Sequence, residues 1–158
     1  MKAVYTGTFD PLTLGHLDII KRASEIFDEV YVLISINVNK HTLFSLDERV
    51  KILDRALSGI KNAHVDSFKG LVTDYCIENG IGVIIRGLRN SEDFEYELPM
   101  AYINRDLSSD RLETLYLNAS PEFSYVSSSA VKEIASFKGD FSAYVPDFLV
   151  EEIKAKYN

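Results

Sequence analysis

Short apolar runs alternate along the chain with segments of helical periodicity. Five of the runs are rich in valine, isoleucine and tyrosine and have the length of buried strands: Ala3–Tyr5, Val30–Ile36, His64–Phe68, Gly82–Ile85 and Thr114–Leu117. The alternation continues from end to end without repeats, low-complexity segments or a linker. It therefore predicts one α/β domain over residues 1–158, with a Rossmann-like, doubly wound, five-stranded and mostly parallel sheet flanked by helices.

The segments between the strands predict six helices, over residues 17–27, 45–57, 71–79, 91–106, 128–137 and 146–156. Ser45-Leu-Asp-Glu48 is a capping box that opens the second helix, and Gly80 ends the third. Pro146 suits the first turn of the last helix. Pro99 lies inside the fourth helix and should kink or delay it.

Composition narrows the classes of partner. The chain has 24 acidic and 17 basic residues and a net charge of −7, the wrong sign for holding a polynucleotide by phosphate neutralisation. Cys76 is the sole cysteine, so neither an internal disulfide nor a thiolate metal site is expected, which favours a reducing compartment. Without a signal-like or membrane-length apolar segment, the protein is expected to be cytoplasmic, with no nucleic-acid or membrane partner.

The first strand is followed by a candidate anion site, because ligands of doubly wound folds bind at the carboxyl ends of the strands. Gly7-Thr-Phe-Asp-Pro11 leads into Thr13-Leu-Gly-His16 at a helix start. Gly7 allows a ligand to approach the backbone, Thr8 can donate from hydroxyl and amide, and His16 faces the same space. The alternative is a simple strand-to-helix turn in which His16 caps or packs.

Two more loops bring polar groups to the same edge of the sheet. Asn37-Val-Asn-Lys40 places a cation after the second strand, although such a loop is solvated in most proteins. Ser124-Tyr-Val-Ser-Ser-Ser129 places hydroxyls and amides at a helix start after the fifth strand, a phosphate-binding arrangement. Taken alone, the serines would be read only as a helix cap.

Two arginines follow the buried run of the fourth strand, in the segment Ile84-Ile-Arg-Gly-Leu-Arg89. Guanidinium groups are uncommon in such a place without an anionic partner, so Arg86 and Arg89 are candidate phosphate ligands. The alternative is a pair of structural ion pairs to acidic residues of the next helix. The candidates for those partners are Asp93, Glu95 and Glu97.

Several well-defined site motifs are missing from the sequence. It contains no Gly-x-x-x-x-Gly-Lys and no Gly-x-Gly-x-x-Gly, so the loops that define P-loop ATPases and dinucleotide dehydrogenases are absent from it. It contains no metal-site spacing of His, Cys and Asp and no Gly-x-Ser-x-Gly elbow. No protein-ligated metal is therefore expected.

Together the motifs resemble the nucleotidylyltransferase superfamily, and within it the bacterial phosphopantetheine adenylyltransferase family. Gly7–Pro11, Thr13–His16 and Val126–Ser129 carry the first resemblance; Lys40 and the segment Arg86–Glu97 carry the second. Further matches are Phe44–Arg49, Asn104-Arg105 and Ser127–Lys132, and the similarity runs from Tyr5 to about Asp140. The sequence departs from the family pattern where Thr6 replaces a proline and where Val38, His41 and Thr42 alter the loop around Lys40.

The resemblance implies transfer of AMP from ATP to 4′-phosphopantetheine, giving dephospho-coenzyme A and pyrophosphate by direct in-line attack without a covalent enzyme intermediate. It implies catalytic roles for His16, Thr8, Lys40 and Arg89, and acceptor binding by Thr8, Lys40, Val72 and Arg86. The implied ATP site comprises Thr8, Phe9, His16, Gly87, Leu88, Arg89, Glu97, Phe123, Ser124, Tyr125, Val126, Ser127, Ser128 and Ser129. Mg²⁺ bound to ATP and a homohexamer are implied as well.

Four other functions share parts of these motifs. A transferase acting on nicotinamide mononucleotide, or a cytidylyltransferase acting on an alcohol phosphate, would use the same His16 motif, but the segment Arg86–Glu97 argues against both. A class I aminoacyl-tRNA synthetase would need a longer and less acidic chain. A non-catalytic nucleotide-binding module is disfavoured because Thr8, His16, Lys40 and both arginines are present together.

Overall fold

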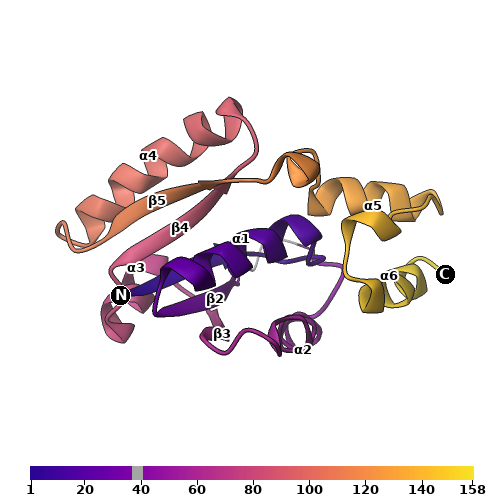
Figure 1. The fold of residues 1–158 in the computed structure, drawn as a ribbon, viewed down its shortest axis with the longest axis horizontal. Coiled ribbons are helices and arrows are strands. Elements are labelled where there is room, and N and C mark those ends of the chain that lie inside the picture. The colour runs from indigo at the N-terminus through magenta and orange to yellow at the C-terminus, as the bar shows by residue number, and fades with distance from the viewer. Residues whose placement is uncertain (37–40) are drawn as a thin grey trace.

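A five-stranded parallel sheet forms the centre of the computed structural model, which describes residues 1–36 and 41–158 (Figure 1). Its strands are β1 (Lys2–Gly7), β2 (Glu29–Ser35), β3 (Ala63–Phe68), β4 (Val83–Leu88) and β5 (Glu113–Asn118). They lie in the order β3-β2-β1-β4-β5. The predicted doubly wound sheet is confirmed. Because the order reverses between β1 and β4, the point where such folds bind ligands lies at the carboxyl ends of these two strands.

Among the described residues, six α-helices connect and flank the strands. They are α1 (Leu14–Ile26), α2 (Leu46–Leu57), α3 (Val72–Asn79), α4 (Ser91–Leu107), α5 (Ser128–Ser136) and α6 (Val150–Lys156), with short 3₁₀ turns at Pro121–Phe123, Ser142–Tyr144 and Asp147–Leu149. The capping box at Ser45 begins α2 and the left-handed Gly80 ends α3, as predicted. Within the described part of the chain, no helix combines the length and apolar character that a membrane crossing requires.

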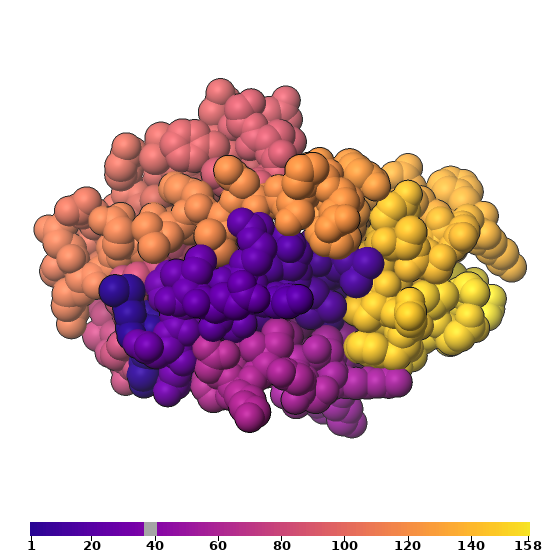
Figure 2. All heavy atoms as spheres, viewed as in Figure 1, coloured from indigo at the N-terminus to yellow at the C-terminus, as the bar shows by residue number. Residues whose placement is uncertain are grey.

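The sheet is packed on both faces. On one face Ile85 belongs to a buried cluster with Ile20 of α1 and Leu53 of α2. The same cluster takes in Leu149 and Ile153 near the C-terminus, so the yellow C-terminal segment of Figure 2 closes over the end of this face. On the other face the strands pack against α3, with Tyr75 and Cys76 at the centre, while α4 lies over β4 and β5.

Two expectations about prolines, a delayed fourth helix and a first-turn position for Pro146, are contradicted by the structure. Pro99 does not delay its helix, because Asn90 caps α4 by accepting a hydrogen bond from the backbone N–H of Asp93, and the helix then runs through Pro99 to Leu107. Pro146 does not sit in a first α-helical turn. Its ψ of 140° is extended, a 3₁₀ turn follows it, and α6 begins only at Val150.

Candidate active site

Three cavities meet at the carboxyl ends of β1 and β4. The first, of about 280 Å³, is lined among others by His16, Gly87 and Arg89. The second, of about 340 Å³, lies under α4 and is lined among others by Val72, Met100 and Asn104. These two cavities share three lining residues, Thr6, Arg86 and Glu97. The third, of about 380 Å³, shares His16 and Ser128 with the first and adds Thr8, Ser129 and Lys132.

The loop that carries Thr8 is fixed by buried polar contacts. Buried Arg49 of α2 donates from NH1 to the Thr8 carbonyl at 2.9 Å. The buried carboxylate of Asp10 accepts from the backbone N–H groups of Leu43 and Phe44 at 2.7 and 2.9 Å. These bonds tie the β1–α1 loop to α2 and the segment before it and hold the backbone at Thr8 in place, because buried polar groups are costly to leave unpaired.

Phe9 shapes the same loop from inside. Its φ of 50° turns the chain directly after Thr8, and its ring covers the open face of Gly7. A Cβ on Gly7 would lie only 3.0 Å from that ring, so this glycine accommodates Phe9. The ring also packs edge-on against the imidazole of His16, with centroids 5.1 Å apart. Phe9 therefore packs behind Gly7 and His16 and supports both residues.

His16 completes the N-terminal cap of α1. The Thr13 side chain accepts from the His16 backbone N–H, and the Thr13 backbone N–H donates to His16 Nδ1 at 3.1 Å. Because a backbone N–H can only donate, Nδ1 is the acceptor, and the neutral ring carries its proton on Nε2. The alternative role as a cap is thus realised, and it fixes the tautomer of a residue that lines two cavities.

The charge state of His16 follows from its surroundings. Burial, and then the positive charge of Arg89, lower the pKa of the imidazole from 6.5 to about 4. At neutral pH the ring is therefore uncharged. A group with this pKa is a poor proton acceptor but a well-placed neutral hydrogen-bond donor through Nε2.

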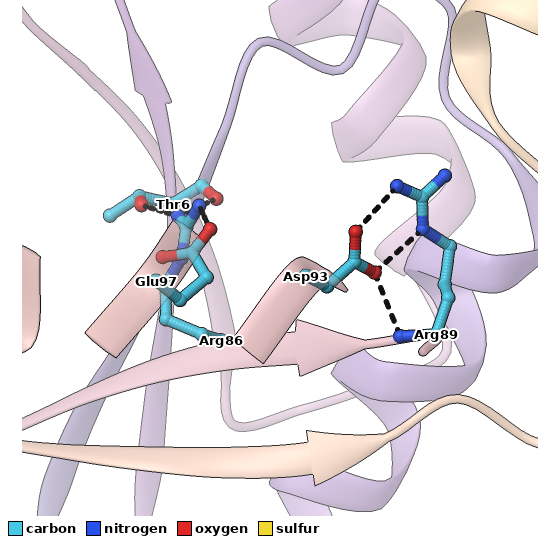
Figure 3. Close-up of polar contacts among 5 residues, drawn as sticks. All are labelled: Thr6, Arg86, Arg89, Asp93 and Glu97. Carbon is cyan, nitrogen blue, oxygen red and sulfur yellow. Dashed lines mark hydrogen bonds and ion pairs between the residues drawn. The ribbon is translucent and has the colours of Figure 1, made fainter. Parts of the chain in front are cut away.

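The two arginines each hold a carboxylate of α4 (Figure 3). Arg86 binds Glu97 through Nε and NH2, at 2.8 and 2.5 Å. Arg89 binds Asp93 through Nε and NH2, at 3.0 and 2.9 Å, and its backbone N–H donates to the same carboxylate. This pairing raises the pKa of Arg89 and holds the pKa of Asp93 below its usual range. The alternative of internal ion pairs is therefore present, with Glu97 and Asp93 as the partners.

These pairs also describe how the arginines would meet a phosphate. Each guanidinium presents its Nε–NH2 edge to two oxygens of one acidic group, the same bidentate geometry that a phosphate accepts. Arg86 and Glu97 line both the first and the second cavity, whereas Arg89 and Asp93 line only the first. The Arg86 guanidinium thus lies where the first and second cavities meet, and the Arg89 guanidinium lies at the first cavity alone.

The serines of the segment Ser127–Ser129 also make structural hydrogen bonds. Ser127 caps α5 by accepting from the Ala130 backbone N–H, and Ser128 donates to the Pro11 carbonyl at 2.8 Å. The latter bond fastens the start of α5 to the β1–α1 loop. Ser128 and Ser129 line the third cavity beside Thr8, so these hydroxyls and the start of α5 lie at one wall of it.

The structure brings most of the sequence-predicted residues together but separates some. His16, Arg86, Gly87, Arg89, Glu97, Phe123, Val126, Ser127 and Ser128 line the first cavity. Thr8, Phe9 and Ser129 line the third, and Val72 lines the second. Leu88, Ser124 and Tyr125 line none of the three, and Tyr125 packs instead against Tyr144 beside a separate apolar groove. Lys40 lies outside the described residues.

Sequence reasoning assigned no role to the residues that support the site. Asp10 and Arg49 lie inside motifs noted in the sequence, but only the fold shows that they hold the Thr8 loop. Arg49 could have been identified from the sequence, because it is a charged residue at a helical spacing otherwise occupied by the apolar residues of α2. Among residues 1–36 and 41–158, no group of three or more His, Cys, Asp or Glu side chains is arranged to hold a metal ion.

Comparison with known proteins identifies the class first. Residues 4–134 match the sequence model of the cytidylyltransferase-like family. Two solved structures share the fold: a putative nicotinate-nucleotide adenylyltransferase from Vibrio parahaemolyticus and the Plasmodium falciparum nicotinic acid mononucleotide adenylyltransferase complexed with NaAD. Both have a TM-score of 0.70, at 18% and 12% identity, with 99% of this chain and 96% and 98% of those chains covered.

Curated relatives identify the family within that class. The phosphopantetheine adenylyltransferase of Alkaliphilus metalliredigens is 49% identical over 153 residues, covering 97% of each chain. That of Thermotoga neapolitana is 53% identical over 145 residues, covering 92% of this chain and 89% of the relative. The chain therefore belongs to the phosphopantetheine adenylyltransferase family of nucleotidyltransferases.

Proposed function

We propose that this protein transfers AMP from ATP to 4′-phosphopantetheine, releasing pyrophosphate and forming dephospho-coenzyme A. The observation that carries the proposal is the meeting of the first and second cavities at Thr6, Arg86 and Glu97. ATP in the first cavity and an elongated acceptor in the second would bring their phosphates together beside Arg86. Family membership supports the same pair of substrates.

The second cavity fits an acceptor with a flexible arm. Its lining combines the apolar side chains of Leu71, Val72 and Met100 with the polar side chain of Asn104. A pantetheine arm carries a gem-dimethyl group and then amides separated by methylene groups, so it would use both kinds of surface. Arg86 at one end of the cavity would bind the terminal phosphate, together with Lys40.

The chemistry requires positioning rather than a protein base. A phosphomonoester has a second pKa near ~6, so the acceptor phosphate is largely dianionic at neutral pH and is already a nucleophile. We propose direct in-line attack on the α-phosphorus of ATP, without a covalent enzyme intermediate. The Nε2–H of His16 and the hydroxyl of Thr8 would stabilise charge on the α-phosphate, while Arg89 and Ser127–Ser129 would hold the rest of the triphosphate.

Mg²⁺ belongs to the substrate in this proposal. The ion is normally bound to ATP through the phosphates and keeps several of its water ligands. The reaction then needs no set of protein carboxylates to bind it. The third cavity, lined by Thr8, Ser129 and Lys132, offers hydroxyl and ammonium groups to a β,γ-phosphate pair. Chelation of Mg²⁺ is therefore expected to stop the reaction without unfolding the protein.

The test is pyrophosphate release by the purified protein with MgATP and a panel of acceptors. We expect turnover with 4′-phosphopantetheine, little with nicotinamide mononucleotide or an alcohol phosphate, and loss of activity when CTP replaces ATP. Mass spectrometry of the product should identify dephospho-coenzyme A. ATP binding without pyrophosphate release for every acceptor would favour the non-catalytic alternative instead.

We also propose a cytoplasmic homohexamer. Support for association comes from α4, none of whose residues is buried in the single chain. Its exposed apolar side chains are Phe94, Tyr96, Met100, Tyr102, Ile103 and Leu107. Monomeric proteins rarely leave so many large apolar side chains of one helix exposed to water. Sedimentation velocity is expected to give a hexamer at micromolar concentration; a monomer under those conditions would contradict the proposal.

A further inference from the structure

The guanidinium of Arg86 is held on two sides by different elements (Figure 3). Its NH1 donates to the Thr6 hydroxyl oxygen at 2.7 Å and to the Thr6 carbonyl at 3.2 Å. Its Nε–NH2 edge faces the carboxylate of Glu97. Thr6 belongs to β1 at the centre of the sheet, whereas Glu97 belongs to α4. These four hydrogen bonds define the plane and direction of the guanidinium.

The two sides differ in what a ligand could replace. A phosphate can take the place of the Glu97 carboxylate, because both present two oxygens to the Nε–NH2 edge. It cannot take the place of Thr6, whose carbonyl is part of the sheet and whose hydroxyl lies on the opposite edge of the fork. An anion that displaced Glu97 would therefore find Arg86 still held through NH1.

The Thr6 side chain gives Arg86 an acceptor that the backbone alone does not supply. The Thr6 hydroxyl makes the shorter of the two bonds to NH1. Thr6 also lines both cavities that meet at Arg86, so its side chain is at the junction itself.

We infer that Thr6 is a positioning residue for the acceptor's phosphate: its hydroxyl fixes the Arg86 guanidinium so that the Nε–NH2 edge faces the junction of the first and second cavities. The inference rests on the proposed function for the identity of the acceptor. It deepens that function by assigning a role to a residue outside the catalytic motifs. Thr6 acts through Arg86, so its loss should affect the acceptor and leave ATP largely unaffected.

The matched variants are Thr6→Val, which keeps the β-branched shape and the backbone carbonyl but loses the hydroxyl, and Thr6→Ser, which keeps the hydroxyl. Because a hydrogen bond to a charged donor is lost while the carbonyl bond remains, we expect Thr6→Val to raise KM for 4′-phosphopantetheine roughly 5- to 20-fold. KM for ATP and the thermal midpoint should change little, and Thr6→Ser should restore KM. Unchanged acceptor KM in Thr6→Val, or an equal rise in both KM values, would overturn the inference.

A double-mutant cycle shows whether Thr6 acts through Arg86. Adding Thr6→Val to Arg86→Met should cost little more than Arg86→Met alone, since methionine has no donor for the hydroxyl. Full additivity of the two losses would contradict a positioning role.

Binding of inorganic phosphate, measured by calorimetry, separates this inference from the proposed function. If the wild-type chain forms no dephospho-coenzyme A, the proposed function fails. Weaker phosphate binding in Thr6→Val and recovery in Thr6→Ser would still support the role of Thr6, and equal binding by all three proteins would refute it.

Discussion

Replacement of His16 by alanine is expected to lower kcat by roughly a hundred- to a thousandfold, the usual cost of removing one preorganised donor to a developing oxyanion. In the proposed mechanism the Nε2–H of His16 is such a donor, because the Thr13 backbone N–H occupies Nδ1 and fixes the tautomer. ATP affinity, measured by calorimetry without acceptor, should stay within severalfold of wild type, since the contact is used most in the transition state. Turnover close to wild type would remove His16 from the mechanism.

His16→Gln is the matched control for that substitution. Its amide N–H can reach the region of the imidazole Nε2, so it should recover part of the lost kcat without restoring an ionisable group. Because Thr13 and His16 also form the cap of α1, both variants need a thermal denaturation measurement. Loss of kcat in His16→Ala with recovery in His16→Gln, at similar stability, would separate the donor from the cap.

The pH profile distinguishes a neutral donor from an imidazolium. With a pKa of about 4, His16 is uncharged above about pH 5, and the step should not depend on its titration there. If the charged ring were the active form, kcat would fall about tenfold per pH unit above the pKa. The acceptor phosphate titrates near ~6 in every variant. The ratio of wild-type to His16→Gln kcat cancels that effect and should stay constant between about pH 5 and 8.

The sequence predicted the arrangement of the strands better than the ends of the helices. Continuous apolar runs such as Val30–Ile36 are typical of strands in a sheet that is covered on both faces. Their order and spacing therefore predict the fold. The prolines misled because their effect depends on neighbours: Asn90 starts α4 before Pro99 can delay it, and the extended ψ of Pro146 places it before the helix. Local propensity gives no access to such contacts.

The site was predicted as a set of groups at one edge of the sheet, but not as a set of pairings. The position of Arg86 directly after a buried apolar run was visible in the sequence, although the structure extends β4 through Arg86 to Leu88. Its choice of Glu97 over Glu95 depends on which side of α4 faces the strand. The neutral state of His16 was equally hidden, because it comes from burial and from the nearby charge of Arg89. The structure adds that Tyr125 lines none of the three cavities and packs against Tyr144 instead, because adjacent residues of a turn point in different directions.

Replacement of Arg86 by glutamine is expected to lower kcat/KM for 4′-phosphopantetheine by roughly a hundred- to ten-thousandfold, with a much smaller change in KM for ATP. Two charge-assisted bonds to the phosphate would be lost together, each worth about 1.5 to 3 kcal/mol. Arg86→Lys should recover little of the loss, because an ammonium cannot form the bidentate contact. Steady-state kinetics with each substrate varied in turn measures the split. Equal effects on both substrates would place Arg86 outside the acceptor's phosphate site.

Stability must be separated from binding in this variant, because Arg86→Gln also leaves the Glu97 carboxylate without its partner. The Glu97 side chain is only 14% exposed, so an unpaired charge there should lower the thermal midpoint. The double variant Arg86→Gln/Glu97→Gln removes the orphaned charge and should recover much of that midpoint. Acceptor affinity should not recover with it, because the guanidinium is still missing. If repairing the stability also restored acceptor kcat/KM, Arg86 would be a structural partner of Glu97 and the phosphate site would have to lie elsewhere.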